Sequence, residues 1–184
     1  MLNKELFLKE ITILKAFYTK WNFNDKDPMQ MNIWYQSFAA VDDKDFERII
    51  ETFCRTHIHA PESPNEILMI LANEEEKKWM NPEQAFNYVR ELIRDYGWYY
   101  GSKDIYSRIK NNPALFETVK EMENDLQELT DRDQFIPKRF KDIYAVKLKT
   151  MCMRKRDEKL RLAAEHDKKF IESQVFGNAL PYEV

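Results

Sequence analysis

Glycine is scarce in this chain of 184 residues, which contains only Gly97, Gly101 and Gly177. The phosphate-binding loops of P-loop and dinucleotide-binding proteins need clustered glycines, because these let the backbone approach the phosphate closely. The three glycines of this chain are scattered. The sequence therefore argues against an ATPase and against a Rossmann enzyme.

Residues that bind metals or act as nucleophiles are also few. Cys54 and Cys152 lie far apart without a CxxC motif, which is typical of structural thiols in a reducing compartment. His57 and His59 are two residues apart and would point to different faces of a helix, and His166 is remote from both. No serine lies in a nucleophile-elbow motif. We therefore expect no metal, no cofactor and no enzymatic activity, with an enzyme built from scattered residues as an open alternative.

Long apolar runs are missing as well. No stretch reaches eighteen consecutive apolar residues, and the N-terminal sequence MLNKELFLKE mixes charges into its apolar positions. A membrane helix or a signal peptide would need an uninterrupted apolar segment. We therefore expect a cytoplasmic protein that does not contact membranes.

Apolar residues instead recur at three- and four-residue steps along the whole chain, which predicts an all-α fold. Residues 1–78 are expected to form a first module of four helices. Its later helices should begin at Asp27-Pro28, at Asp42-Asp43 and at a capping box from Ser63 to Glu66. Trp34 lies on the apolar face of the second helix and is expected to anchor the core.

Residues 79–153 are expected to form a second helical module. A cap followed by proline at Asn81-Pro82 starts its first helix, and Gly97 stops that helix. Ser102 is a candidate cap for a short helix, and Asn112-Pro113 starts the next. Pro137 should begin a long basic C-terminal helix, which a partly flexible tail follows.

Positive charge is concentrated near the C-terminus. The segment KRFKDIYAVKLKTMCMRKRDEKLRL, residues 138–162, holds ten Lys or Arg in 25 positions. Residues 138–169 carry a net charge of +7, whereas residues 1–137 carry –8. One interpretation is a long solvated helix, and the other is an electrostatic arm that attracts nucleic acid or an acidic protein surface.

The apolar pattern divides this basic segment into two parts. From Phe140 to Met151 a continuous apolar stripe can pack on the second module, whereas residues 154–159 contain no apolar residue. We therefore expect packing to end near Met153 and residues 154–184 to form a partly flexible arm that folds onto a partner. The candidate partner-binding residues are Arg154, Lys155, Arg156, Lys159, Leu160, Leu162, Phe170 and Phe176.

Three segments of the first module resemble a known family. The helix Asn32–Phe38 with its Trp-Tyr pair, the following Asp42-Asp43, and the segment Pro61–Ile67 are similar to the N-terminal helical domain of bacteriophage replicative-helicase loader/inhibitor proteins. The resemblance covers about the first 75 residues. Residues Tyr96–Trp98 and Arg139–Tyr144 resemble the helical second half of phage replication proteins more loosely, because the glycine expected before the Arg-Phe-x-x-x-Tyr element is absent.

The resemblance implies an adaptor without ATPase activity in the cytosol of a bacterial host. Such a protein binds a hexameric replicative DNA helicase through its C-terminal part, holds the helicase inactive, or loads it at an origin bound by an initiator protein. Single-stranded DNA is a second candidate ligand. The alternative is a DNA-binding regulator of replication or transcription, in which residues 138–162 contact phosphate.

Overall fold

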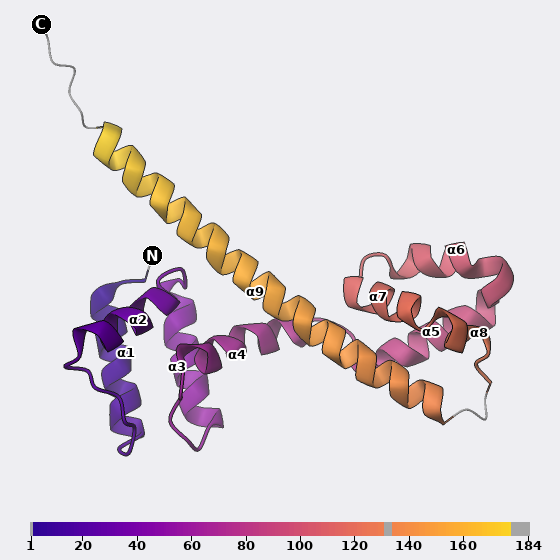
Figure 1. Cartoon of the computed structure of the whole chain (residues 1–184), viewed down its shortest axis with the longest axis horizontal. Helices are drawn as coiled ribbons and strands as arrows, with labels where there is room; N and C mark the ends of the chain where they lie inside the picture. The colour runs from indigo at the N-terminus through magenta and orange to yellow at the C-terminus, as the bar shows by residue number, and fades with distance from the viewer. Residues whose placement is uncertain (1, 131–133, 178–184) are drawn as a thin grey trace, which may run out of the picture. The chain divides into compact units, whose positions relative to one another are not determined.

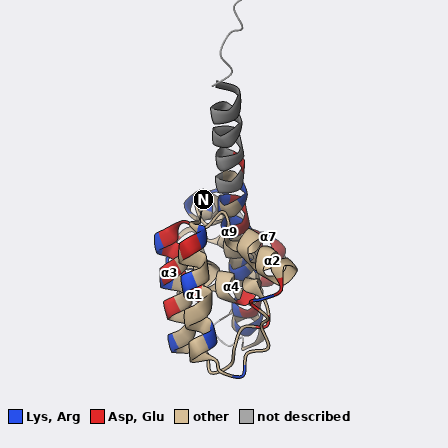
Figure 2. Cartoon of the chain, turned by 90° about the vertical axis from the view of Figure 1, so that its left-hand side faces the viewer, with Lys and Arg blue, Asp and Glu red and all other residues tan. Residues whose placement is uncertain are grey.

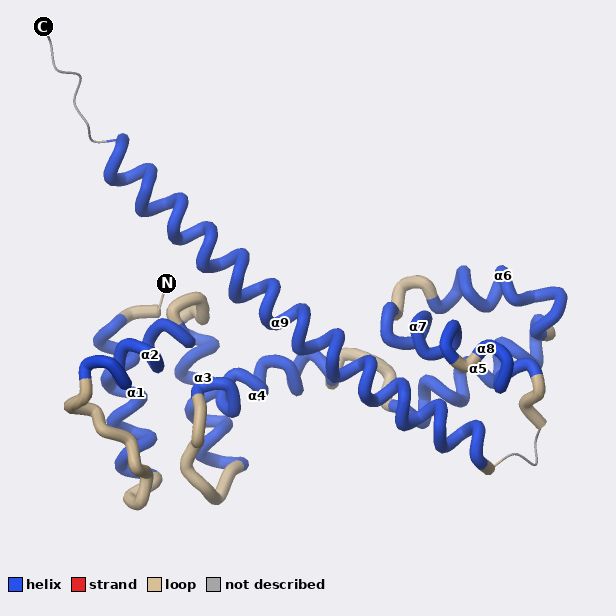
Figure 3. Tube along the Cα trace, in the orientation of Figure 1, coloured by secondary structure: helices blue, strands red, loops and turns tan. Residues whose placement is uncertain are grey.

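The chain is all-α, as the sequence predicts. The computed structural model describes residues 2–130 and 134–177, without the side chains of residues 99–101, 163, 164 and 166–177. Within those ranges the chain forms helices and no strand (Figure 3). The helices are α1 (Lys4–Phe17), α2 (Pro28–Phe38), α3 (Asp43–Thr56), α4 (Pro64–Glu76), α5 (Pro82–Tyr96), α6 (Trp98–Ile109), α7 (Pro113–Glu121), α8 (Glu123–Gln127) and α9 (Phe135–Gly177). None of these described helices combines the length and the apolar character needed to cross a membrane.

The chain divides into two compact units. Unit 1 comprises residues 1–71 and 156–184, and unit 2 comprises residues 72–155. The boundaries therefore fall inside α4 and inside α9, and each of these helices contributes residues to both units (Figure 1). The module boundaries at residues 78 and 153 and the separate arm 154–184 stay predictions.

Several helix starts are confirmed by the side chains that cap them. The Asp27 carboxylate accepts a hydrogen bond from the backbone N–H of Met29 (2.9 Å), and α2 begins at the next residue, Pro28. Asn81 and Gln84 form a reciprocal capping box at the start of α5. These side chains satisfy backbone donors that have no partner within the helix, so local sequence is sufficient to place the starts.

One predicted cap is wrong. The predicted helix after Ser63 is present, because α4 begins at Pro64, and the Glu66 carboxylate accepts a hydrogen bond from the backbone N–H of Glu62 (3.1 Å). Ser102 lies inside α6, which already begins at Trp98. The earlier start follows from Gly97, whose φ of +68° allows the chain to reverse between α5 and α6 without a longer loop.

Aromatic side chains fill much of the core of unit 1. Trp34 is 5% exposed, and its ring packs edge-on against Trp21 and Phe23 at 5.1 Å between centroids in each case. Helices α1 and α3 lie side by side (Figure 1), and Tyr18 Oη donates a hydrogen bond to the backbone carbonyl of His57 (2.9 Å). The prediction that Trp34 lies in the core is confirmed.

The core of unit 2 forms around the first half of α9. Phe140, Tyr144 and Leu148 are buried there, as the predicted apolar stripe requires. Tyr144 Oη donates a hydrogen bond to the backbone carbonyl of Met80 (3.0 Å), and Asn112 Nδ2 donates to Tyr144 Oη (3.3 Å). Burial raises the pKa of the Tyr144 phenol. These contacts fix the first half of α9 in the core of unit 2.

Candidate interaction surface on the C-terminal helix

Much of the positive charge in the first half of α9 is balanced within unit 2. Arg139 pairs with Asp125 (2.7 Å), Lys141 with Glu83 (2.8 Å), and Lys147 with Glu121 (2.8 Å). These carboxylates come from α5, α7 and α8, which pack around the helix. The basic composition of this half therefore overstates the positive charge that a partner would meet.

The eight residues predicted to bind a partner do not share one face of α9. Arg154 and Leu162 are exposed, and Leu162 retains 53% of its accessible surface. Residues 154, 158, 161, 162 and 165 follow helical steps of three and four, so they line one solvent-facing stripe. Phe170 and Phe176 belong to α9, but their side chains lie outside the described residues.

Lys155 faces unit 2. Its ammonium group lies 4.4 Å from the centre of the Trp79 ring and 3.4 Å from Glu75 Oε1. Lys78 Nζ donates to Glu75 Oε2 (2.8 Å), and this hydrogen bond is the main reason why the pKa of Glu75 lies below its ordinary value. Lys155 is therefore held by a carboxylate and an aromatic face near the C-terminal end of α4.

Arg156 is almost enclosed by unit 1. Only 8% of its side chain is exposed, and Nη1 donates to Asn65 Oδ1 (3.1 Å) and contacts Met69 Sδ at 3.5 Å. Its carboxylate partner is the neighbouring Asp157, with 2.6 Å between Nη2 and Oδ1. A guanidinium with so little contact to water needs these polar partners, because an unpaired buried charge is strongly unfavourable.

Lys159 and Leu160 also contact unit 1. Lys159 Nζ lies 3.4 Å from Asp45 Oδ2 near the start of α3, and Leu160 packs against the apolar core of the unit. Arg48 is the first cause of the lowered pKa of Asp45, and Lys159 adds to it. The prediction that packing ends near Met153 is therefore wrong, because the Arg156 side chain is enclosed and Leu160 packs against the core of unit 1.

The partners of these residues could not be found from the sequence. Asp45, Asn65, Met69 and Glu75 lie 80 to 114 positions away from the arm residues that they contact, and Trp79 is similarly distant from Lys155. Asp45 lies in α3, Asn65, Met69 and Glu75 lie in α4, and Trp79 follows α4. Only the tertiary structure brings them to α9.

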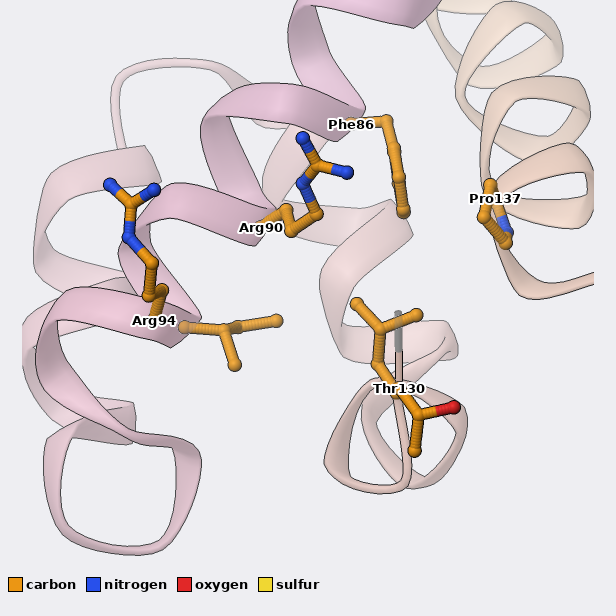
Figure 4. Close-up of a pocket in the computed structure, with 7 residues that line it drawn as sticks. Phe86, Arg90, Arg94, Thr130 and Pro137 are labelled. Atoms are coloured by element: carbon orange, nitrogen blue, oxygen red, sulfur yellow. The ribbon is translucent and has the colours of Figure 1, made fainter. Parts of the chain in front are cut away.

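A small cavity lies on the α5 side of unit 2 (Figure 4). Its volume is about 190 Å³, and its lining combines Arg90 and Arg94 with Phe86, Thr130 and Pro137. Ligand sites are usually larger, at about 300 to 1,000 Å³. The lining residues include no carboxylate, histidine or cysteine, so the cavity offers no acid–base pair.

The described part of the chain contains no cluster of three or more His, Cys, Asp or Glu residues that could hold a metal ion. Comparisons with protein-family models, with curated proteins and with solved structures find no match to this chain. What the structure defines is an all-α protein in which the first part of the long C-terminal helix packs in the core of unit 2 and Leu160 packs against the core of unit 1.

Proposed function

We propose that this protein is an adaptor without catalytic activity that binds a hexameric replicative DNA helicase and inhibits it, loads it at an origin, or does both. The observation that carries the proposal is the solvent-facing stripe of α9, in which Arg154 and Leu162 are exposed and Arg161 pairs with Glu165 of the same stripe (3.1 Å). An arginine beside an exposed apolar side chain suits the centre of a protein interface better than a purely electrostatic site.

The helices of unit 1 support the same proposal through the resemblance described above. Trp34 and Tyr35 lie on α2, an aspartate caps the following α3, and a turn containing Pro61 leads to α4 with Ile67. This is the order of elements in phage helicase loader/inhibitor proteins. An initiator protein bound at the origin is a further partner that this role implies.

The charge pairing on α9 disfavours the alternative of a DNA-binding regulator. Three of the basic residues between positions 138 and 149 are paired with carboxylates of unit 2. A helix that binds DNA through phosphate contacts would need these residues free for the backbone. Single-stranded DNA remains in the proposal only as a second ligand.

The test uses the double variant Arg154→Ala/Leu162→Ala in the full chain and a panel of purified hexameric replicative helicases from bacteria. Both side chains are exposed, so the fold should be unaffected while helicase capture falls at least tenfold. The matched control is Val146→Ala/Lys149→Ala, which removes an exposed apolar residue and an exposed lysine from the unit 2 part of the same helix.

Three results would count against the proposal. Wild-type protein that captures no helicase of the panel would refute it, and so would capture that the Arg154/Leu162 variant retains in full. Loss of single-stranded DNA binding without any helicase binding would favour the regulator. Binding to DNA should weaken steeply with salt, whereas binding to a helicase interface with an apolar core should weaken less.

A further inference from the structure

Three of the arm residues that are predicted to bind a partner are engaged by the chain itself. Arg156 is enclosed by Asn65 and Met69 of α4, and Lys159 reaches Asp45 of α3. Leu160, one helical turn after Arg156, is partly buried against the core of unit 1. We define the segment 156–160 together with these three residues of α3 and α4 as the latch.

The latch has the composition expected of a reversible contact. Leu160 adds a single aliphatic side chain, and in the Lys159–Asp45 pair 73% of the lysine side chain and 25% of the aspartate side chain are open to water. Exposed ion pairs of this kind are weak and are screened by salt. Arg156 is the enclosed residue of the latch, but its carboxylate partner Asp157 is its neighbour on the same segment of α9. The guanidinium therefore keeps its counter-charge when the segment detaches.

The latch also stabilises the helical conformation of residues 154–160. Residues 154–159 contain no apolar residue, and an isolated helix of such composition is marginal in water. The contacts of Arg156 and Leu160 supply the tertiary support that the segment lacks. Loss of these contacts should allow the backbone of the segment to open.

We propose that the latch is autoinhibitory: in the free protein it holds Arg156, Lys159 and Leu160 on α3 and α4, and a protein partner gains these side chains only when the segment is released. The inference rests on the proposed function, because it assigns these residues to the same helicase contact as Arg154 and Leu162. If only the open state binds the partner, the apparent Kd equals the intrinsic Kd divided by the fraction of molecules that are open. A variant that opens the latch without changing the arm should therefore bind more tightly.

The experiment changes only the body side of the latch. The full-length double variant Asp45→Asn/Asn65→Ala removes the negative charge that pairs with Lys159 and the amide oxygen that accepts from Arg156, and it leaves every residue of the arm intact. The control is Glu51→Gln, which removes one charge from the same helix at a site where the carboxylate pairs with Arg55 within α3. Hydrogen–deuterium exchange of residues 154–162 in the free protein is the first readout. Affinity for the helicase captured by wild-type protein is the second.

The proposal expects exchange in residues 154–162 to accelerate and helicase affinity to rise about tenfold in the double variant, with neither change in Glu51→Gln. Unchanged exchange in the double variant overturns the latch itself. Faster exchange with unchanged helicase affinity overturns its autoinhibitory role. If exchange is faster in the double variant but the protein binds no helicase, the proposed function and the autoinhibition are both refuted. The latch itself would then still be supported as a conformational contact.

Discussion

Replacing Trp34 by alanine should strongly destabilise unit 1. The indole is 5% exposed and contacts the rings of Trp21, Phe23 and Phe38. A buried tryptophan covers about 200 Å², which corresponds to about 5 kcal/mol at about 25 cal/mol per Å². Residual burial in the denatured chain reduces this by about 10 to 40%. The expected cost is therefore about 4 kcal/mol, within the usual range of about 3 to 5 kcal/mol for this substitution.

Urea denaturation followed by far-ultraviolet circular dichroism measures the effect. With a slope of about 2 kcal/mol per M, a loss of about 4 kcal/mol lowers the midpoint of the unit 1 transition by about 2 M. Because the chain has two units, hydrogen exchange should assign the change. Helices α1 to α3 should lose protection, whereas α5 to α8 should keep it.

The control is Ile33→Ala on the same helix. Ile33 is 55% exposed, so its truncation should change the free energy of unfolding by less than about 0.5 kcal/mol. If Trp34→Ala shifted the midpoint no more than Ile33→Ala does, the core assignment of the indole and the estimate built on it would both be refuted.

Three further predictions concern substitutions of single residues. Tyr144→Phe leaves the carbonyl of Met80 without its donor and should cost about 1 to 3 kcal/mol in urea denaturation; an unchanged midpoint would show that the hydrogen bond contributes nothing. Gly97→Ala meets no atom within 4 Å, so its expected cost of about 1 to 3 kcal/mol comes from the positive φ alone, and a Tm at or above that of wild type would contradict it. Asp45 has a lowered pKa, first through Arg48, so its contribution is present above the unfolded pKa of about 3.9 and is lost as pH falls through the folded pKa. Wild type should therefore be more stable than Asp45→Asn at pH 7, and the difference should shrink as the pH falls below the unfolded pKa of about 3.9; a difference independent of pH would contradict this.

The starts of several helices follow from the sequence because their causes are local. Asp27 and Asn81 accept hydrogen bonds from backbone groups two or three residues ahead, and the proline after each has a dihedral angle suited to the first helical position. Apolar spacing likewise places Phe140 and Tyr144 in the core. At α6 two starts were compatible with the local sequence, one at Ser102 and one directly after Gly97. The structure has the second, so the prediction from Ser102 is wrong.

The candidate interaction surface depended on tertiary structure to a much greater extent. The sequence identified a basic, apolar-poor segment, but it treated Arg154, Arg156 and Leu162 alike. In the structure Arg156 is enclosed while Arg154 and Leu162 face solvent.

That division is set by residues of α3 and α4, which lie more than 80 positions away in the chain. Composition and periodicity report which side chains share a helix face, because that depends on neighbours within a few residues. Which face a partner can reach depends on what the rest of the chain has already covered, and only the folded structure brings those distant residues together.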